Sequence, residues 1–168
     1  MMTMSNAPQQ ISTRDGQCVR LAERVLARLE EVAGKKQIPV PVEMIAALCG
    51  YQVLLLTTLP LELSGLVSLE RKLIGINSKH HFRRQRFSVA HELGHILLKH
   101  PPEVRSTTHE IKIHDREADI FAAELLMPTA DLRKMAQREC NIAVLKKRYE
   151  VSEEALKIKL ASIESTKF

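Results

Sequence analysis

The chain of 168 residues is poor in cysteine and has no long apolar segment, and these two absences narrow its class. Its cysteines, Cys18, Cys49 and Cys140, are far apart and odd in number. Such usage argues against a disulfide scaffold and predicts reduced thiols in a cytoplasm. No apolar run approaches the roughly 18 residues of a membrane-spanning helix. A cytoplasmic globular protein without membrane contact is therefore expected.

The N-terminal segment also lacks a feature that would mark it for export. Residues 1–15 are polar and have no apolar core, so they are not a secretory signal, and we expect a disordered leader. The remaining length fits one domain with a small appendage. We expect residues 16–129 to form the main domain, with residues 130–168 as a C-terminal helical extension packed on it.

The most informative segment runs from His91 to His95 and has the pattern HExxH. Apolar residues at helical spacing predict a helix over residues 82–99, ended by two prolines. On a helix, residues four apart share a face about 6 Å apart along the axis, so both imidazoles can reach one zinc ion. Glu92 lies about 100° round the helix, where it can take a proton from zinc-activated water. The segment predicts a zinc-dependent peptidase.

The apolar periodicity and the turn residues predict a mostly helical α+β fold with a small sheet of about three strands. Residues 99–113 are expected to form a polar loop after the histidine helix. The expected helices cover residues 17–33, 42–49, 82–99, 114–127, 128–139, 141–149 and 152–163, and the expected strands cover 51–59, 65–69 and 72–77.

A catalytic zinc site needs a third protein ligand and an open position for water. Glu117 and Glu124 lie seven apart on one face of the expected helix, about 10 Å apart along its axis, so only one can reach the metal. Asp119 lies about 200° from Glu117, and it could instead accept a hydrogen bond from a ligating imidazole. His114 and His109 are candidate donors to the oxyanion of the reaction.

Two separated motifs give the chain a specific family resemblance. The sequence RFSVAHELGHILL at residues 86–98 precedes EADIFAAELLMP at residues 117–128. In this order the two resemble the ImmA/IrrE-type metallopeptidases, and the resemblance covers residues 40–130. It implies a zincin-like domain with a zinc site similar to that of the gluzincins. The implied roles are zinc ligation by His91, His95 and Glu117 and base catalysis by Glu92.

The same resemblance implies a biological role. Members of that family are cytoplasmic proteins of bacteria or phages, and they typically cleave a cognate helix-turn-helix repressor. Cleavage induces a mobile element or a stress response. The resemblance therefore implies a protein substrate, with Zn²⁺ as the metal and Mn²⁺ as the alternative.

Two other classes of function compete with a peptidase. Residues 142–160 have a helix-turn-helix rhythm, and the net charge of +5 weakly favours acidic partners or nucleic acid. The alternative is a non-catalytic DNA-binding or repressor-docking regulator. Glu153 and Glu154 at the start of its second helix would repel phosphate, which makes direct DNA binding the weaker interpretation. A purely structural zinc site usually includes cysteine, and none lies near the histidines.

Overall fold

The computed structural model describes residues 13–102, 106–139 and 141–165. It confirms the mostly helical α+β fold with a small sheet. Residues 1–12 of the expected leader lie outside the described residues, whereas residues 13–15 already belong to the first helix. The elements are α1 (Thr13–Ala33), α2 (Val42–Leu48), β1 (Gln52–Leu56), β2 (Gly65–Ser68), β3 (Leu73–Asn77), α3 (Phe82–Leu97), α4 (Thr108–Leu126), α5 (Thr129–Arg138), α6 (Ile142–Tyr149) and α7 (Glu153–Ser165).

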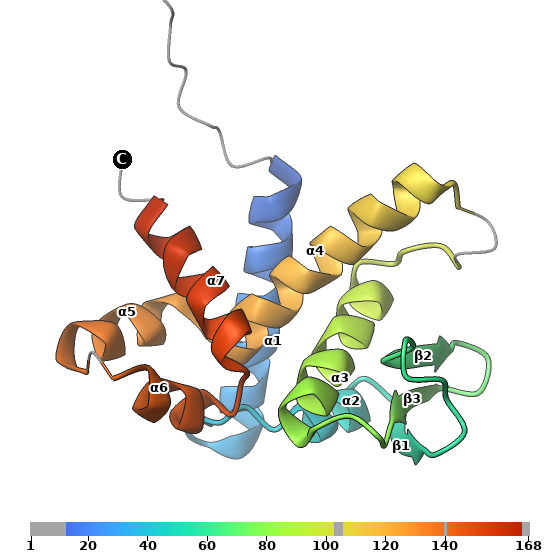
Figure 1. The fold of residues 1–168 in the computed structure, drawn as a ribbon, viewed down its shortest axis with the longest axis horizontal. Helices are drawn as coiled ribbons and strands as arrows, with labels where there is room; N and C mark the ends of the chain where they lie inside the picture. Colours follow the sequence, from blue (N-terminus) through green and yellow to red (C-terminus); the bar gives the residue numbers. More distant parts are fainter. Residues whose placement is uncertain (1–12, 103–105, 140, 166–168) are drawn as a thin grey trace, which may run out of the picture.

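The three strands form one mixed sheet in the order β1-β3-β2. The central strand β3 pairs in parallel with β1 and antiparallel with β2, where Gly65 lies opposite Ile76. Ile74 and Ile76 of β3 are fully buried, because the alternating side chains of a strand direct one set toward the core. As Figure 1 shows, the sheet lies at one end of the molecule, next to α3, with β2 as an edge strand.

Helices α3 and α4 pack closely, and a glycine makes the approach possible. A Cβ atom added to Gly94 of α3 would lie 3.0 Å from the Cα and 3.2 Å from the carbonyl oxygen of Ala118 in α4. Those distances are shorter than ordinary van der Waals contacts between heavy atoms. Gly94 therefore brings the histidine helix against the middle of α4 (Figure 1).

Helix α4 begins at Thr108, so the predicted loop over residues 99–113 is wrong for residues 108–113. Thr107 and Glu110 form a capping box, in which the Glu110 amide donates to Thr107 Oγ1 and the Thr107 amide donates to Glu110 Oε2. A threonine followed three residues later by glutamate is a known helix-start signature. The early start places His109 within α4 and moves His114 from the first residue of the expected helix to the interior of the observed one.

The C-terminal helices α5, α6 and α7 share the core of the rest of the molecule. Leu145, Tyr149 and Leu156 are buried in the same hydrophobic cluster as the side chains of α3 and α4. The buried Lys159 of α7 donates to Glu124 Oε2 of α4 at 2.6 Å. This buried ion pair joins the last helix to the helix that precedes α5.

Two further expectations concern the bulk properties of the chain. Cys18 and Cys49 are free thiols, and Cys140 lies outside the described residues. Within the described ranges, every helix is too short or too polar to cross a membrane.

Candidate metal centre

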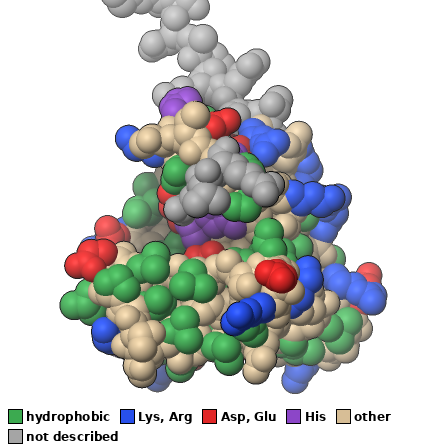
Figure 2. Space-filling model, turned by 90° about the vertical axis from the view of Figure 1, so that its right-hand side faces the viewer, with side chains coloured by type: hydrophobic (Ala, Val, Ile, Leu, Met, Phe, Trp, Pro, Cys, Tyr) green, Lys and Arg blue, Asp and Glu red, His purple; other side chains and the backbone are tan. Residues whose placement is uncertain are grey.

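The two histidines of the HExxH segment point to the same place. One turn apart on α3, His91 and His95 have their Nε2 atoms 2.9 Å from each other. Both rings are partly exposed. Figure 2 shows histidine side chains in a recess, with acidic side chains beside them and many hydrophobic side chains on the surface below. The expected convergence of two imidazole nitrogens is therefore present.

An acidic residue of α4 joins the two histidines. Asp115 Oδ1 lies 3.4 Å from His95 Nε2 and 4.0 Å from His91 Nε2. In the part of the chain that the structure describes, His91, His95 and Asp115 offer ligand atoms within 4.8 Å of one another. Two imidazole nitrogens and one carboxylate oxygen are a donor set that suits a catalytic zinc ion. The residues present therefore fit the metal that the sequence implies.

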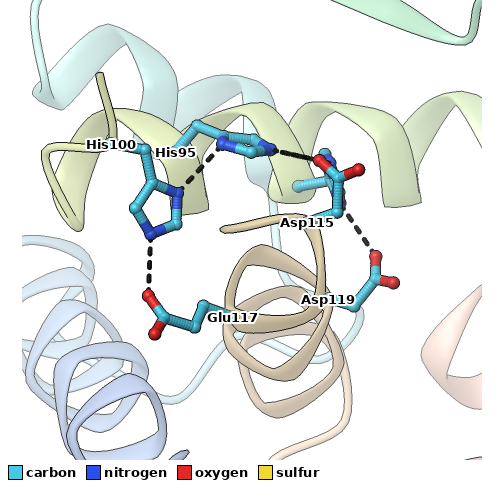
Figure 3. A network of polar contacts seen from close by, with 6 residues as sticks. His95, His100, Asp115, Glu117 and Asp119 are labelled. Atoms are coloured by element: carbon cyan, nitrogen blue, oxygen red, sulfur yellow. Dashed lines mark hydrogen bonds and ion pairs between the residues drawn. The ribbon is translucent and has the colours of Figure 1, made fainter. Parts of the chain in front are cut away.

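The structure does not bring Glu117, the ligand implied by the resemblance, to the two histidines. Its carboxylate is buried on another side of α4, where it accepts hydrogen bonds from His100 and Arg14 (Figure 3). Residues two apart on a helix differ in direction by about 200°, so Asp115 and Glu117 cannot both face α3. Because Ala118 of α4 packs against Gly94, the face of α4 that carries Asp115, one turn earlier, lies toward the histidines of α3.

The other candidate, Glu124, is also elsewhere. Its carboxylate accepts hydrogen bonds from the amide and hydroxyl of Thr129 as well as from Lys159. The third metal ligand was expected to be a glutamate, so Asp115 was not among the residues considered for that position. The usable signal was spacing, because Asp115 and Asp119 are four apart on α4, just as His91 and His95 are on α3.

Asp119 contacts the first histidine on the ring atom that points away from the candidate metal position. Its Oδ1 accepts a hydrogen bond from His91 Nδ1 at 2.8 Å. Burial lowers the pKa of His91, but the hydrogen bond and charge of Asp119, with the charges of Glu92 and Asp115, raise it above its ordinary value overall. With Nδ1 as the donor, the lone pair of Nε2 is left for a metal.

The second histidine has a different partner, which the sequence-based analysis left without a role. His95 Nδ1 lies 2.9 Å from Nδ1 of the buried His100, just beyond the end of α3. Burial, followed by the nearby imidazoles, lowers the pKa of His95 to about 4. Burial also lowers the pKa of His100 despite its bond to Glu117. Both rings are therefore neutral at pH 7, the form in which histidine binds metals.

The remaining predicted residues lie around this group. A Cβ added to Gly65 of the edge strand β2 would lie 2.9 Å from Glu92 Oε1, so the Glu92 carboxylate borders the sheet edge. His114 stacks on the His100 ring with centroids 4.4 Å apart. His109 is exposed in the first turn of α4. Among the described residues, no contact marks either imidazole as an oxyanion donor, and those two roles stay predictions.

An HExxH helix packed against a second helix that supplies an acidic side chain is the arrangement of a zinc peptidase fold. Sequence comparison agrees with that class. The peptidase family described as the IrrE N-terminal-like domain matches residues 51–161. The chain belongs to this family.

Two individual proteins are similar to this chain, one in sequence and one in fold. The chain is 32% identical over 99 residues to the radiation response metalloprotease IrrE of Deinococcus radiodurans, covering 52% of this chain and 30% of that protein. It thus spans less than a third of the length of this relative. A solved structure described as a Mycobacterium tuberculosis transcriptional regulator is similar with a TM-score of 0.63 at 16% identity, covering 87% of this chain and 47% of the other. That likeness concerns the fold alone.

Proposed function

We propose that this protein is a zinc-dependent endopeptidase whose metal is bound by His91 Nε2, His95 Nε2 and the carboxylate of Asp115. The observation that carries the proposal is the meeting of these three donors, from two helices, within 4.8 Å of one another. Asp115 replaces Glu117, the ligand implied by the resemblance. Mn²⁺ is the alternative metal.

The side chains around the donors suit peptide hydrolysis. A bound zinc ion polarises a carbonyl group and lowers the pKa of water from 15.7 towards about 7. Glu92, next to His91 on α3, accepts the proton of the attacking water and delivers it to the leaving amine. Asp119 holds the His91 ring through Nδ1 and so keeps Nε2 directed toward the metal position.

The surface beside Glu92 suits a protein substrate. The edge strand β2 has one side free of strand partners, which is a template for an extended peptide. Leu61, Leu63 and Leu66, in and before this strand, have exposed fractions of 61%, 41% and 39%. Apolar side chains at this edge favour a polypeptide with apolar residues over a small polar substrate.

We further propose that the substrate is a cognate helix-turn-helix repressor in a bacterial cytoplasm and that its cleavage induces a mobile element or a stress response. The family resemblance supports this role, and the relative from Deinococcus radiodurans is a radiation response metalloprotease. The corresponding test uses purified helix-turn-helix repressors from the organism that carries the gene. Cleavage by the zinc-loaded protein but not by Glu92→Gln is expected. If the protein cleaves unfolded casein but leaves these repressors intact, the peptidase activity is supported and the repressors are rejected as its substrate.

Metal analysis of purified variants tests the ligand set. One zinc per chain is expected in the wild type and in Glu117→Gln, with loss of zinc in Asp115→Asn. The reverse pattern would assign the third ligand to Glu117. An absence of zinc from the wild type after incubation with the metal would reject the metallopeptidase itself.

The alternative of a DNA-binding regulator receives less support. Lys159 of α7 is buried against Glu124, and the exposed start of the same helix has Glu153 and Glu154. These acidic side chains would face the phosphates of a bound duplex. Binding to DNA that weakens steeply with salt would revive this alternative.

A further inference from the structure

A chain of hydrogen bonds runs from His95 through the protein interior to α1. His95 Nδ1 lies 2.9 Å from His100 Nδ1, and His100 Nε2 lies 2.9 Å from Glu117 Oε2. Arg14 Nε of α1 donates to Glu117 Oε1 at 2.8 Å. Figure 3 shows His100 between His95 and Glu117, with Asp115 on the opposite side of His95.

The direction of each hydrogen bond follows from the chemistry of its partners. An ionised carboxylate only accepts, and Glu117 is paired as an ion with the Arg14 guanidinium, whose Nε lies 2.8 Å from Glu117 Oε1. His100 Nε2 must therefore carry the hydrogen. A neutral imidazole with its hydrogen on Nε2 has only a lone pair on Nδ1, so His95 Nδ1 must donate to it. The Nε2 lone pair of His95 is then free to face His91 and Asp115.

We propose that His100, held by Glu117 and Arg14, is a positioning residue that fixes the tautomer and ring orientation of His95 for metal binding. The proposal rests on the metal centre proposed above. It also assigns Glu117 a role other than ligation, because this carboxylate acts on the metal through two imidazoles. The alternative tautomer of His95 would place two Nδ1 lone pairs against each other and a hydrogen on the metal-binding nitrogen.

The two metal-binding histidines are therefore held in unequal environments. Asp119, the partner of His91, has a side chain that is 57% exposed, so water can replace its hydrogen bond. The side chains of His100 and Glu117 are 2% and 5% exposed. A buried polar group that loses its partner finds no water in exchange, which makes the interior chain the stronger constraint. His100 should matter to metal binding at least as much as Asp119.

Zinc affinity, measured by competition with a chromophoric chelator, tests the proposal in three variants and the wild type. His100→Phe keeps a ring against His114 but has no acceptor, and we expect zinc binding about 10–100-fold weaker. His100→Asn places an oxygen close to the position of Nδ1 and should restore most of that loss. His80→Gln is the matched control, since His80 contacts the Leu61 carbonyl instead, and it should bind zinc as the wild type does.

Nitrogen-15 NMR of the zinc-loaded protein gives a second readout that a merely structural role would not change. We expect the wild type to show a hydrogen on His95 Nδ1 that exchanges slowly with water. In His100→Phe this hydrogen should exchange rapidly while the HExxH helix stays folded. A wild-type His95 with its hydrogen on Nε2 would overturn the proposal.

The outcomes separate this proposal from the proposed function. A wild type that binds no zinc rejects the metal centre. A wild type that binds one zinc, with equal affinity in His100→Phe, retains the metal centre and overturns the role of His100. If His100→Phe does not fold, the comparison of His100→Asn with His100→Gln tests the proposal instead. The asparagine side chain offers an acceptor to His95, whereas the longer glutamine side chain reaches the position of Nε2 and leaves His95 without its acceptor. Tighter zinc binding by the asparagine variant is expected, and equal or weaker binding would refute the proposal.

Discussion

Replacing Gly94 by alanine should destabilise the protein, although alanine is the better helix former. In a helix interior the change alone would stabilise by about 1 kcal/mol. The new Cβ, however, would lie 3.0 Å from the Cα and 3.2 Å from the carbonyl oxygen of Ala118. These atoms belong to the backbone of α4, so the helix itself must move away. Overpacking of this kind costs about 1–3 kcal/mol, which leaves a net loss of up to about 2 kcal/mol.

The movement should also weaken metal binding. His91 and His95 lie on α3, whereas Asp115 lies on α4 close to the contact point. Separation of the two helices by a few tenths of an ångström would shift the carboxylate relative to both imidazoles. We therefore expect Gly94→Ala to lower zinc affinity together with the free energy of unfolding.

Urea unfolding of the metal-free proteins and chelator competition measure the two effects. Gly16→Ala is the matched control, because its Cβ would meet only the flexible end of Arg20, with Nη1 at 3.2 Å. That variant should be more stable than the wild type by up to about 1 kcal/mol and should bind zinc normally. If Gly94→Ala were stabilised as much as Gly16→Ala, the close packing of α3 and α4 would be refuted.

Three further predictions follow from the site and the core. Glu92→Gln should bind one zinc but lose peptide hydrolysis, so loss of zinc from this variant would argue against a base role. Zinc binding should weaken as the pH falls through the raised pKa of His91, because a proton then competes with the metal for that ring, whereas His95, with a pKa of about 4, stays neutral. The logarithm of the apparent dissociation constant should therefore change by about one per pH unit between pH 5 and 6. A slope of two would show that both rings compete with protons. Lys159→Met leaves the buried Glu124 carboxylate without its cation and should cost about 3–5 kcal/mol in urea unfolding, with recovery in the double variant that adds Glu124→Gln.

Helix boundaries show how local signals succeed and fail. The prolines after α3 and the glycines after α1 and α2 placed the ends of these helices within a few residues, because both residue types act on the backbone locally. The start of α4 was missed because residues 108–113 have only two apolar side chains, Ile111 and Ile113, which lie two apart and form no apolar stripe at helical spacing. The capping box of Thr107 and Glu110 was the local signal that a search for hydrophobic periodicity passes over.

The pairing of His91 with His95 and the place of Glu92 beside them were determined by the sequence alone, since helical geometry fixes the relation of residues one and four apart. The choice among the acidic residues of α4 was decided only by the tertiary structure. Asp115, Glu117, Asp119 and Glu124 lie on one helix, and its rotation determines which of them faces α3. That rotation depends on burying the apolar side of α4 and on seating Ala118 against Gly94. A contact between residues 24 positions apart has no local signature, so only the packed helices show that Asp115 meets the histidines while Glu117 turns to His100 and Arg14.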